Sequence, residues 1–157
     1  MANIQVEKAI EINPNDYHNL CAKGWFLTFS GRLTEGIACT IEAMRINPFA
    51  SDGCLMVVGM AEYLAGRYDV ALKAFGEMKA NSEFKLGCLA VCYVLLGREV
   101  EARATAADFR KVAEDYPEGP DRASDRRRQY WANFLPFRVP TDRERFFDAM
   151  REAGIPI

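Results

Sequence analysis

Five cysteines carry the clearest chemical potential in this sequence: Cys21, Cys39, Cys54, Cys88 and Cys92. Cys88 and Cys92 are four residues apart, which places both thiols on one face of a helix and would suit two metal ligands. A structural zinc site needs four ligands, and the single histidine, His18, is far away in the sequence. We therefore interpret the cysteines as reduced thiols that pack as small apolar side chains. No metal and no cofactor are expected.

Catalytic patterns are absent from the sequence. One histidine leaves no Ser-His-Asp arrangement in a motif context. The glycines at 31, 66 and 97 recur at regular distances, whereas a phosphate-binding loop needs a strand before it and a helix after it. The sequence therefore predicts that this chain is not an enzyme.

A basic run precedes two aromatic residues near the C-terminus: Arg122, Arg126, Arg127 and Arg128 before Tyr130 and Trp131. Such a run could contact phosphates and stack on bases. The balance of 20 basic against 22 acidic residues disfavours nucleic acid as a partner. We favour a solvated helix face whose aromatic end is buried.

The composition describes one packed domain. The 157 residues are 50% apolar and 27% charged, which allows a core and argues against disorder. No apolar run reaches the roughly 20 residues that cross a bilayer, and no leader pattern marks the N-terminus. With an odd number of cysteines, these features predict a cytoplasmic protein without a membrane segment.

Two sequence markers repeat along the chain, and the helices that they delimit must position any functional side chains. Gly-Arg pairs occur at residues 31, 66 and 97, and Asn-Pro pairs at residues 13 and 47. Glycine ends a helix by taking the left-handed conformation, and proline cannot continue one. The repeating unit is therefore a helix, a short glycine turn, a second helix and a break. Such pairs bury their apolar faces by stacking on one another.

This pattern resembles the tetratricopeptide repeat family, in which small residues lie where the paired helices touch. The matching positions are Leu20, Gly24, Leu27, Gly36, Ala43 and Pro48 in the first full unit, Leu55, Gly59, Ala71 and Phe75 in the second, and Leu86, Ala90, Tyr93, Ala102 and Ala106 in the third. Thr40 departs from it, because an aromatic residue is common there. The resemblance implies an all-α, TPR-like helical-hairpin solenoid with C-terminal capping helices.

The expected domain organisation follows from this resemblance. TPR-like repeats cover residues 3–117, as a half unit at 3–14 and units at about 17–50, 52–81 and 83–116. Paired helices are expected at about 16–30 and 33–46, 51–65 and 68–79, and 82–96 and 99–115. Residues 118–157 form a linker and capping helices. Because residues 3–14 match only the second half of a unit, we expect a segment of a longer protein.

The C-terminal segment carries a second resemblance. A helix is expected over residues 122–134 and another from Thr141, where Thr141 and Glu144 have capping-box spacing and Gly154 ends the helix. Residues 138–156 resemble the end of bacterial signalling proteins that carry a class III adenylate or guanylate cyclase domain, or a winged-helix regulator, before such repeats. The chain itself holds no cyclase residues, so the resemblance implies only that an upstream domain could be a nucleotide cyclase.

The candidate site is the apolar groove that the first helices of such repeats line. Aligned by repeat, its residues are His18, Cys21, Trp25, Met56, Met60, Tyr63, Phe84, Cys88 and Val91. An apolar groove suits an amphipathic helix, and methionines can re-pack around varied partners. The sequence thus favours a non-catalytic scaffold that binds proteins, or itself, through this groove. Three alternatives stay open: these residues are ordinary core, the C-terminal helices fill the groove, or a pocket among Trp25, Tyr63 and Phe84 senses a small ligand.

Overall fold

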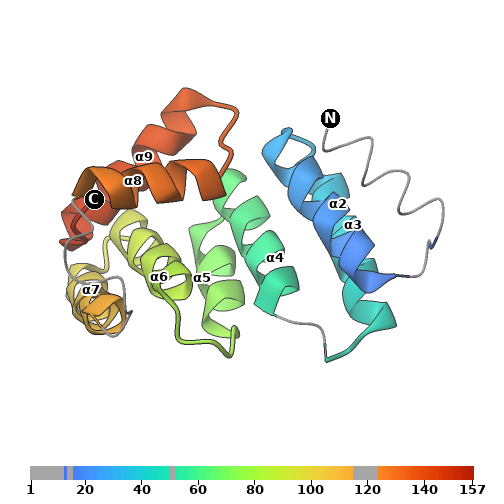
Figure 1. Ribbon diagram of the computed structural model, residues 1–157, viewed down its shortest axis with the longest axis horizontal. Coiled ribbons are helices and arrows are strands. Elements are labelled where there is room, and N and C mark those ends of the chain that lie inside the picture. The colour runs from blue at the N-terminus through green and yellow to red at the C-terminus, as the bar shows by residue number, and fades with distance from the viewer. Residues whose placement is uncertain (1–12, 14–15, 50–51, 115–123) are drawn as a thin grey trace. The chain divides into compact units, whose positions relative to one another are not determined.

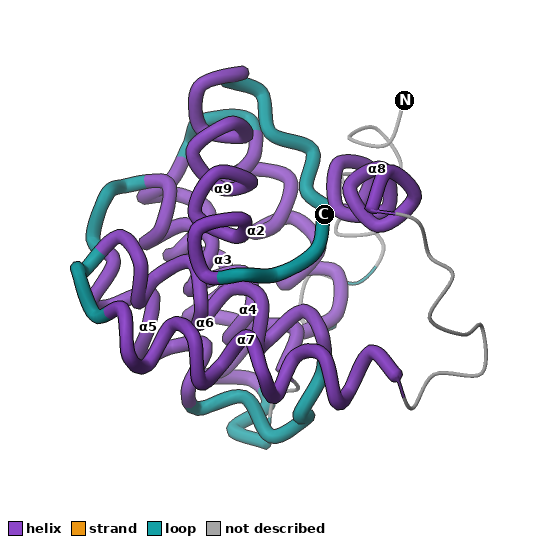
Figure 2. Tube along the Cα trace, turned by 90° about the vertical axis from the view of Figure 1, so that its left-hand side faces the viewer, coloured by secondary structure: helices purple, strands orange, loops and turns teal. Residues whose placement is uncertain are grey.

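The computed structural model describes residues 13, 16–49, 52–114 and 124–157, except for the side chains of residues 124–127. This part of the chain contains helices and no strands, so the all-α prediction is confirmed for it. Figures 1 and 2 show the helices joined by short turns within each pair. They are α2 (Tyr17–Phe29), α3 (Leu33–Ile46), α4 (Asp52–Leu64), α5 (Tyr68–Gly76), α6 (Glu83–Leu95), α7 (Glu99–Glu114), α8 (Ser124–Phe134) and α9 (Pro140–Ala153). The half unit predicted at 3–14 lies almost wholly outside the described residues.

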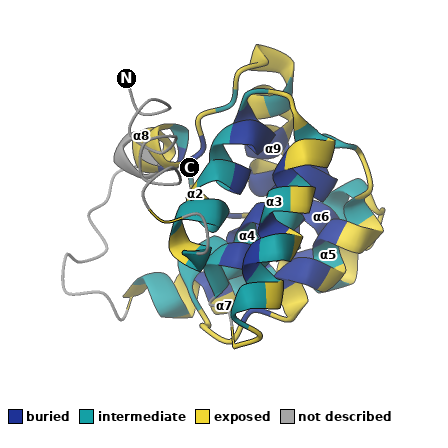
Figure 3. Ribbon diagram, turned by 90° about the vertical axis from the view of Figure 1, so that its right-hand side faces the viewer, coloured by how far each residue is buried: buried dark blue, intermediate teal, exposed yellow. Residues whose placement is uncertain are grey.

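The chain divides into two compact units, which we describe separately. Unit 1 ends at Met78 and contains α2 to α5, and unit 2 runs from Lys79 to Ile157. In unit 1, α2 pairs with α3 and α4 pairs with α5, while α4 also contacts both helices of the preceding pair. Because it has neighbours on several sides, α4 carries more buried residues than α2, α3 or α5. Figure 3 colours the helices by this burial.

A left-handed turn ends the first helix of each pair. Gly66 has a φ of 76°, and Gly31 and Gly97 have φ values of 87° and 70°. The Gly66 N–H donates to the Tyr63 carbonyl at 2.9 Å, and the Arg67 N–H donates to the Glu62 carbonyl at 2.9 Å. These two bonds define the Schellman motif and recur at the other two turns. The Gly-Arg spacing in the sequence therefore reflects a repeated backbone geometry.

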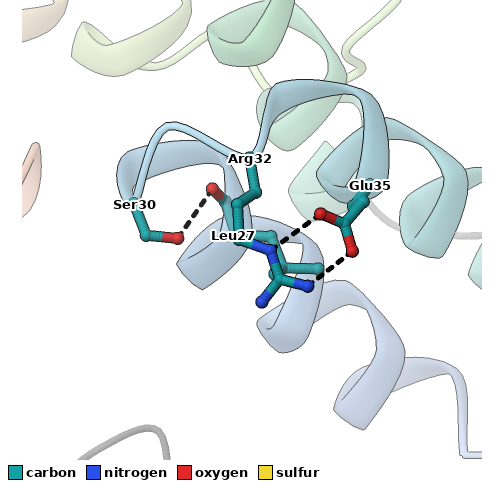
Figure 4. A network of polar contacts seen from close by, with 4 residues as sticks. All are labelled: Leu27, Ser30, Arg32 and Glu35. Atoms are coloured by element: carbon teal, nitrogen blue, oxygen red, sulfur yellow. Dashed lines mark hydrogen bonds and ion pairs between the residues drawn. The ribbon is translucent and has the colours of Figure 1, made fainter.

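The arginine after each glycine finds a carboxylate near the turn. Figure 4 shows Arg32 donating from Nε and Nη2 to Glu35, at 2.7 and 2.5 Å. Arg98 makes the same pairing with Glu101, three residues on. At the middle turn Val70 occupies that position, and Arg67 instead pairs with Glu62, five residues earlier in the chain. Glu62 is 9% exposed, so this pair reaches further into the protein than the other two.

The α2–α3 contact brings two backbones together. A Cβ on Gly24 would lie 3.0 Å from the Gly36 carbonyl oxygen, and a Cβ on Gly36 would lie 2.9 Å from the Gly24 carbonyl oxygen. Thr40 is fully buried here, and its hydroxyl donates to the Gly36 carbonyl at 2.9 Å. An aromatic side chain would not fit beside this contact, which explains why the sequence departs from the family pattern at Thr40.

Unit 2 contains one helix pair and two further helices that pack on it. In the pair, α6 contacts α7, and α9 contacts both. The buried face of α9 is Phe146, Phe147, Ala149, Met150 and Ala153. Arg110 on α7 donates to the Gly154 carbonyl at 2.8 Å, which ties the end of α9 to that helix. Gly154 has a φ of 89° and ends α9 in the same Schellman geometry, so its predicted role is confirmed.

Two predicted helix boundaries were wrong. The last helix begins at Pro140, with Val139 as a cap that makes no side-chain bond, so Thr141 does not cap it. Proline suits the first helical position because its φ is preset and its missing N–H is not needed there. The second helix of the middle pair ends at Gly76, short of the expected residue 79. Glycine inside a helix costs about 1 kcal/mol relative to alanine, which favours an end at that point.

We predict that Gly59→Ala destabilises unit 1, whereas Gly76→Ala does not. A Cβ on Gly59 would lie 2.6 Å from Cδ1 and 2.7 Å from Cζ of Phe75, a ring that is fully buried. Overpacking of this kind costs about 1–3 kcal/mol. A Cβ on Gly76 meets open space, so that variant is the matched control. Urea unfolding measures both, and equal stability of the two variants would contradict the packing described for α4 and α5.

Candidate functional site

The α2 positions of the predicted groove are exposed or half-buried. Asp16 caps the helix by accepting from the His18 and Asn19 N–H groups at 2.8 and 3.3 Å. This cap sets where the helix begins, and His18, Cys21 and Trp25 then follow at helical spacing. His18 is exposed, and Cys21 and Trp25 are half-buried. The Trp25 ring packs on Phe29 with centroids 4.6 Å apart.

The α4 positions are mostly inaccessible. Met60 and Tyr63 are 0% and 1% exposed, and the Tyr63 ring lies 5.7 Å from that of Tyr68. Met56, one turn earlier on the helix, is half-buried. Of the three predicted groove residues on α4, therefore, Met56 is the one that a partner could reach in this conformation.

The α6 positions are half-buried or buried, and Phe84 among them packs against α8. The Phe84 ring stacks on Trp131 of α8 with centroids 5.7 Å apart, and meets Phe134 edge-on at 5.5 Å. A Cβ on Gly87 would lie 2.8 Å from Cη2 of Trp131, so α8 approaches the α6 backbone closely. Cys88 and Val91 are fully buried. Phe84 itself is half-buried, as Trp25 is on α2, so α8 packs against this part of the predicted groove without burying it fully.

The predicted small-ligand pocket draws on both units. Trp25 and Tyr63 belong to unit 1, and Phe84, in unit 2, packs on Trp131. This pocket stays a prediction. A small cavity in unit 2 of about 100 Å³ is lined by Val94, Glu99, Ala102, Arg103 and Glu152, and it is smaller than the roughly 300–1,000 Å³ of typical ligand pockets.

The described part of the basic run packs as a helix surface. The Arg128 guanidinium lies over the Phe147 ring, 5.3 Å from its centroid. Trp131 is fully buried and Tyr130 is exposed, stacked on Phe134. Arg122 and the side chains of Arg126 and Arg127 lie outside the described residues. A buried Trp131 cannot stack on a base, which supports the interpretation of a solvated helix with a buried aromatic end.

Burial sets the chemistry of the α6 thiols. Burial raises the pKa of the Cys92 thiol to about 12 and, with a further contribution from Cys92, raises that of Cys88 well above 9.0. Both thiols therefore stay protonated at neutral pH and are poor nucleophiles. Among the described residues, no group of three or more His, Cys, Asp or Glu is arranged to hold a metal ion.

Sequence reasoning missed several exposed or charged features. Phe49 and Val100 are 87% and 80% exposed, and no periodic pattern marked them as surface residues. The Glu62–Arg67 ion pair was also missed. Position 70, three residues after Arg67, lacks the acidic residue found at the other two turns, which could have indicated that Arg67 pairs with a different carboxylate. Hydrogen bonding to Glu62 raises the pKa of Arg67, and the Arg32 and Arg98 guanidinium groups lower the pKa values of Glu35 and Glu101.

In the described part of the chain, no helix is both long and apolar enough to cross a membrane.

Comparisons with known proteins establish the fold. No family model and no curated protein matches the chain. Among solved structures, the crystal structure of MamA, a TPR-like helical repeat protein, matches with a TM-score of 0.60 at 14% identity, over 94% of this chain and 82% of that chain. At this identity the similarity concerns the fold alone. It confirms the all-α, TPR-like fold class, and the cyclase-like or regulator-like resemblance of residues 138–156 stays a prediction.

We predict that Cys92 makes the protein less stable at alkaline pH. Above pH 9.0 the unfolded chain loses the thiol proton, while the folded protein retains it up to about pH 12. The unfolded state then binds fewer protons, so the free energy of unfolding falls through this window, by about 1.4 kcal/mol per pH unit for one thiol. Cys92→Ala should remove this contribution.

Chemical unfolding at several pH values from 8 to about 11 measures the effect. Val91→Ala is the control, because it opens the same buried region without a titrating group and should lower stability by a pH-independent amount. If the stability difference between wild type and Cys92→Ala is constant with pH, the thiol does not have the raised pKa.

Proposed function

We propose that this chain is a non-catalytic module that binds protein partners as helical segments on the α2 face of unit 1. The binding surface, which we name the α2 surface, consists of His18, Cys21 and Trp25, together with Met56 of α4, which belongs to the same predicted groove. These four residues are the ones in the unit 1 part of the predicted groove that are exposed or half-buried. The similarity in fold to a TPR-like protein supports this class of function without specifying a partner.

The observation that carries the proposal is the incomplete burial of Trp25. Met60 and Tyr63, which belong to the same predicted groove, are buried in the core, whereas Trp25 is half-buried. Tryptophan, with tyrosine and arginine, is enriched among the residues that dominate binding energy at protein interfaces. A half-buried tryptophan on the same helix as polar His18 and the polarizable thiol of Cys21 suits the apolar face of an amphipathic helix.

The wider setting that we propose is the C-terminal part of a bacterial signalling protein. Residues 138–156 support it through their resemblance to the ends of such proteins. In this setting a cyclase-like or regulator domain would supply the activity, and the helical repeats would recruit a partner or a second copy of the chain. This context is separable from the α2 surface, which can be tested on the chain as it stands.

We predict that Trp25→Ala weakens partner binding about thirtyfold, which corresponds to ~2 kcal/mol for loss of a central aromatic contact. Amphipathic helical peptides would be selected from a displayed library against the wild-type chain. Fluorescence anisotropy of a labelled peptide then gives the dissociation constant for each variant. Met56→Ala should weaken binding of the same peptide by a smaller factor.

Val100→Ala is the matched control, because Val100 is an apolar residue on α7 that is 80% exposed. It should leave the dissociation constant unchanged. Circular dichroism and urea unfolding must show that Trp25→Ala still folds. Peptides that bind wild type and Trp25→Ala equally, or a library that yields no binder, would contradict the proposal. Sedimentation velocity with both proteins tests self-association through the same surface.

A further inference from the structure

Trp131 attaches α8 to the rest of unit 2. Its indole stacks on the Phe84 ring of α6, and it also lies 5.7 Å, between ring centroids, from Phe146 of α9. A Cβ on Gly87 would come within 2.8 Å of the indole Cη2 atom and within 3.4 Å of Met150 Cε. The indole therefore occupies space that a larger residue at position 87 would take. We name the four residues around it the Trp131 socket: Phe84, Gly87, Phe146 and Met150.

The rest of α8 contributes little buried surface to this attachment. Among the α8 side chains that the structure describes, 128–134, Trp131 is the one that is fully buried. Arg128 and Phe134 also reach neighbouring aromatic rings, yet both are exposed. The next fully buried side chain is Leu135, directly after the end of the helix. The docking of α8 thus depends mainly on one indole.

The other C-terminal helix, α9, is held more firmly. It buries five side chains, and Arg110 of α7 donates to the Gly154 carbonyl at its end, at 2.8 Å. These contacts do not involve α8. They keep Phe146 and Met150 in place when α8 undocks, so the Trp131 socket would persist without its present occupant.

The docked indole also lacks a hydrogen bond. Trp131 is 0% exposed, and its N–H finds no acceptor among the described residues. Water can accept from this N–H once α8 undocks, so this group favours the undocked state. A helix of 11 residues is also marginal without tertiary contacts. Burial of the indole holds α8 in place, and the unpaired N–H opposes it.

We propose that the Trp131 socket is a binding site for a helical segment of a partner protein, and that α8 occupies it until the partner displaces α8. The segment that fits is an amphipathic helix with a tryptophan for the socket and an apolar residue four positions later. This is the spacing of Trp131 and Leu135, the two buried side chains at this end of α8. The site lies in unit 2, so it does not depend on the α2 surface binding a partner.

Intramolecular occupancy determines the sign of the expected effect. The apparent affinity for a partner falls with the fraction of molecules in which α8 is undocked. Removing Trp131 from the chain should therefore increase binding of a partner helix, whereas removing the tryptophan from the partner helix should abolish it. A tryptophan with a structural role alone would not produce this increase.

A fluorescein-labelled peptide of residues 124–135 tests the proposal on the full-length chain. Fluorescence anisotropy gives its dissociation constant for each protein variant. Trp131→Ala should bind the peptide about tenfold more tightly than wild type, because its socket is open in a larger fraction of molecules. Tyr130→Ala is the matched control, since it removes an exposed aromatic ring beside Trp131, and it should bind as wild type does. The same peptide with Trp131→Ala should bind none of these proteins.

A second substitution locates the bound peptide. Gly87→Leu, added to Trp131→Ala, fills the socket with a side chain and should abolish peptide binding. Unchanged binding by this double variant would place the peptide elsewhere and overturn the proposal. So would equal binding by wild type and Trp131→Ala, or no binding by a Trp131→Ala chain that is folded by circular dichroism.

Hydrogen exchange of the wild-type chain tests the undocking of α8 without a variant. Amides of α8 should exchange about tenfold faster than those of α6, because α8 opens without unfolding of unit 2. Excess unlabelled peptide should accelerate α8 exchange further. Exchange of α8 as slow as that of α6, with or without peptide, would overturn the proposal even if Trp131→Ala does not fold. A wild-type dimer in sedimentation velocity that Trp131→Ala abolishes would assign the socket to a second copy and overturn the proposed partner.

Discussion

The left-handed glycine at the end of each first helix is the constraint on which the structure depends. Any other residue at that φ costs roughly 1–2 kcal/mol, and without the turn the second helix could not fold back on the first. Gly31, Gly66 and Gly97 each allow a backbone N–H to reach back five residues. The helices are 9 to 16 residues long in the three pairs, a length that is marginal for an isolated helix. Their stability must come from the pairing that this turn makes possible.

Close backbone approach is the second consequence of the turn. Gly24 and Gly36 bring two backbones together, and Gly59 makes room for the Phe75 ring. At these points there is no side chain to adjust, so the helices have little freedom to slide past each other.

The fold could be predicted from the sequence because its determinants are local. Glycine turns and Asn-Pro breaks act within a few residues, and they placed most helix ends within one or two positions. The errors occurred where two local signals competed. At the start of α9 the capping box of Thr141 and Glu144 competed with Pro140, whose preset φ let the helix begin earlier.

The candidate site could be predicted only in part, because accessibility is a property of the whole chain. His18, Cys21 and Trp25 follow from helical spacing and remain reachable. Phe84 occupies the equivalent region of α6, yet it packs on Trp131, which is far away in sequence. No periodic pattern within a repeat indicates which distant side chain will cover it.

The placement of the two tryptophans has a consequence for how folding can be followed. The sequence contains two, and unit 1 holds Trp25 while unit 2 holds Trp131. Trp25 is half-buried, whereas Trp131 is fully buried among aromatic rings and its indole N–H has no hydrogen-bond partner among the described residues. Their intrinsic emission therefore arises in different surroundings. Each unit carries its own optical reporter, so the cooperativity of unfolding between the two units can be read directly from the unlabelled protein.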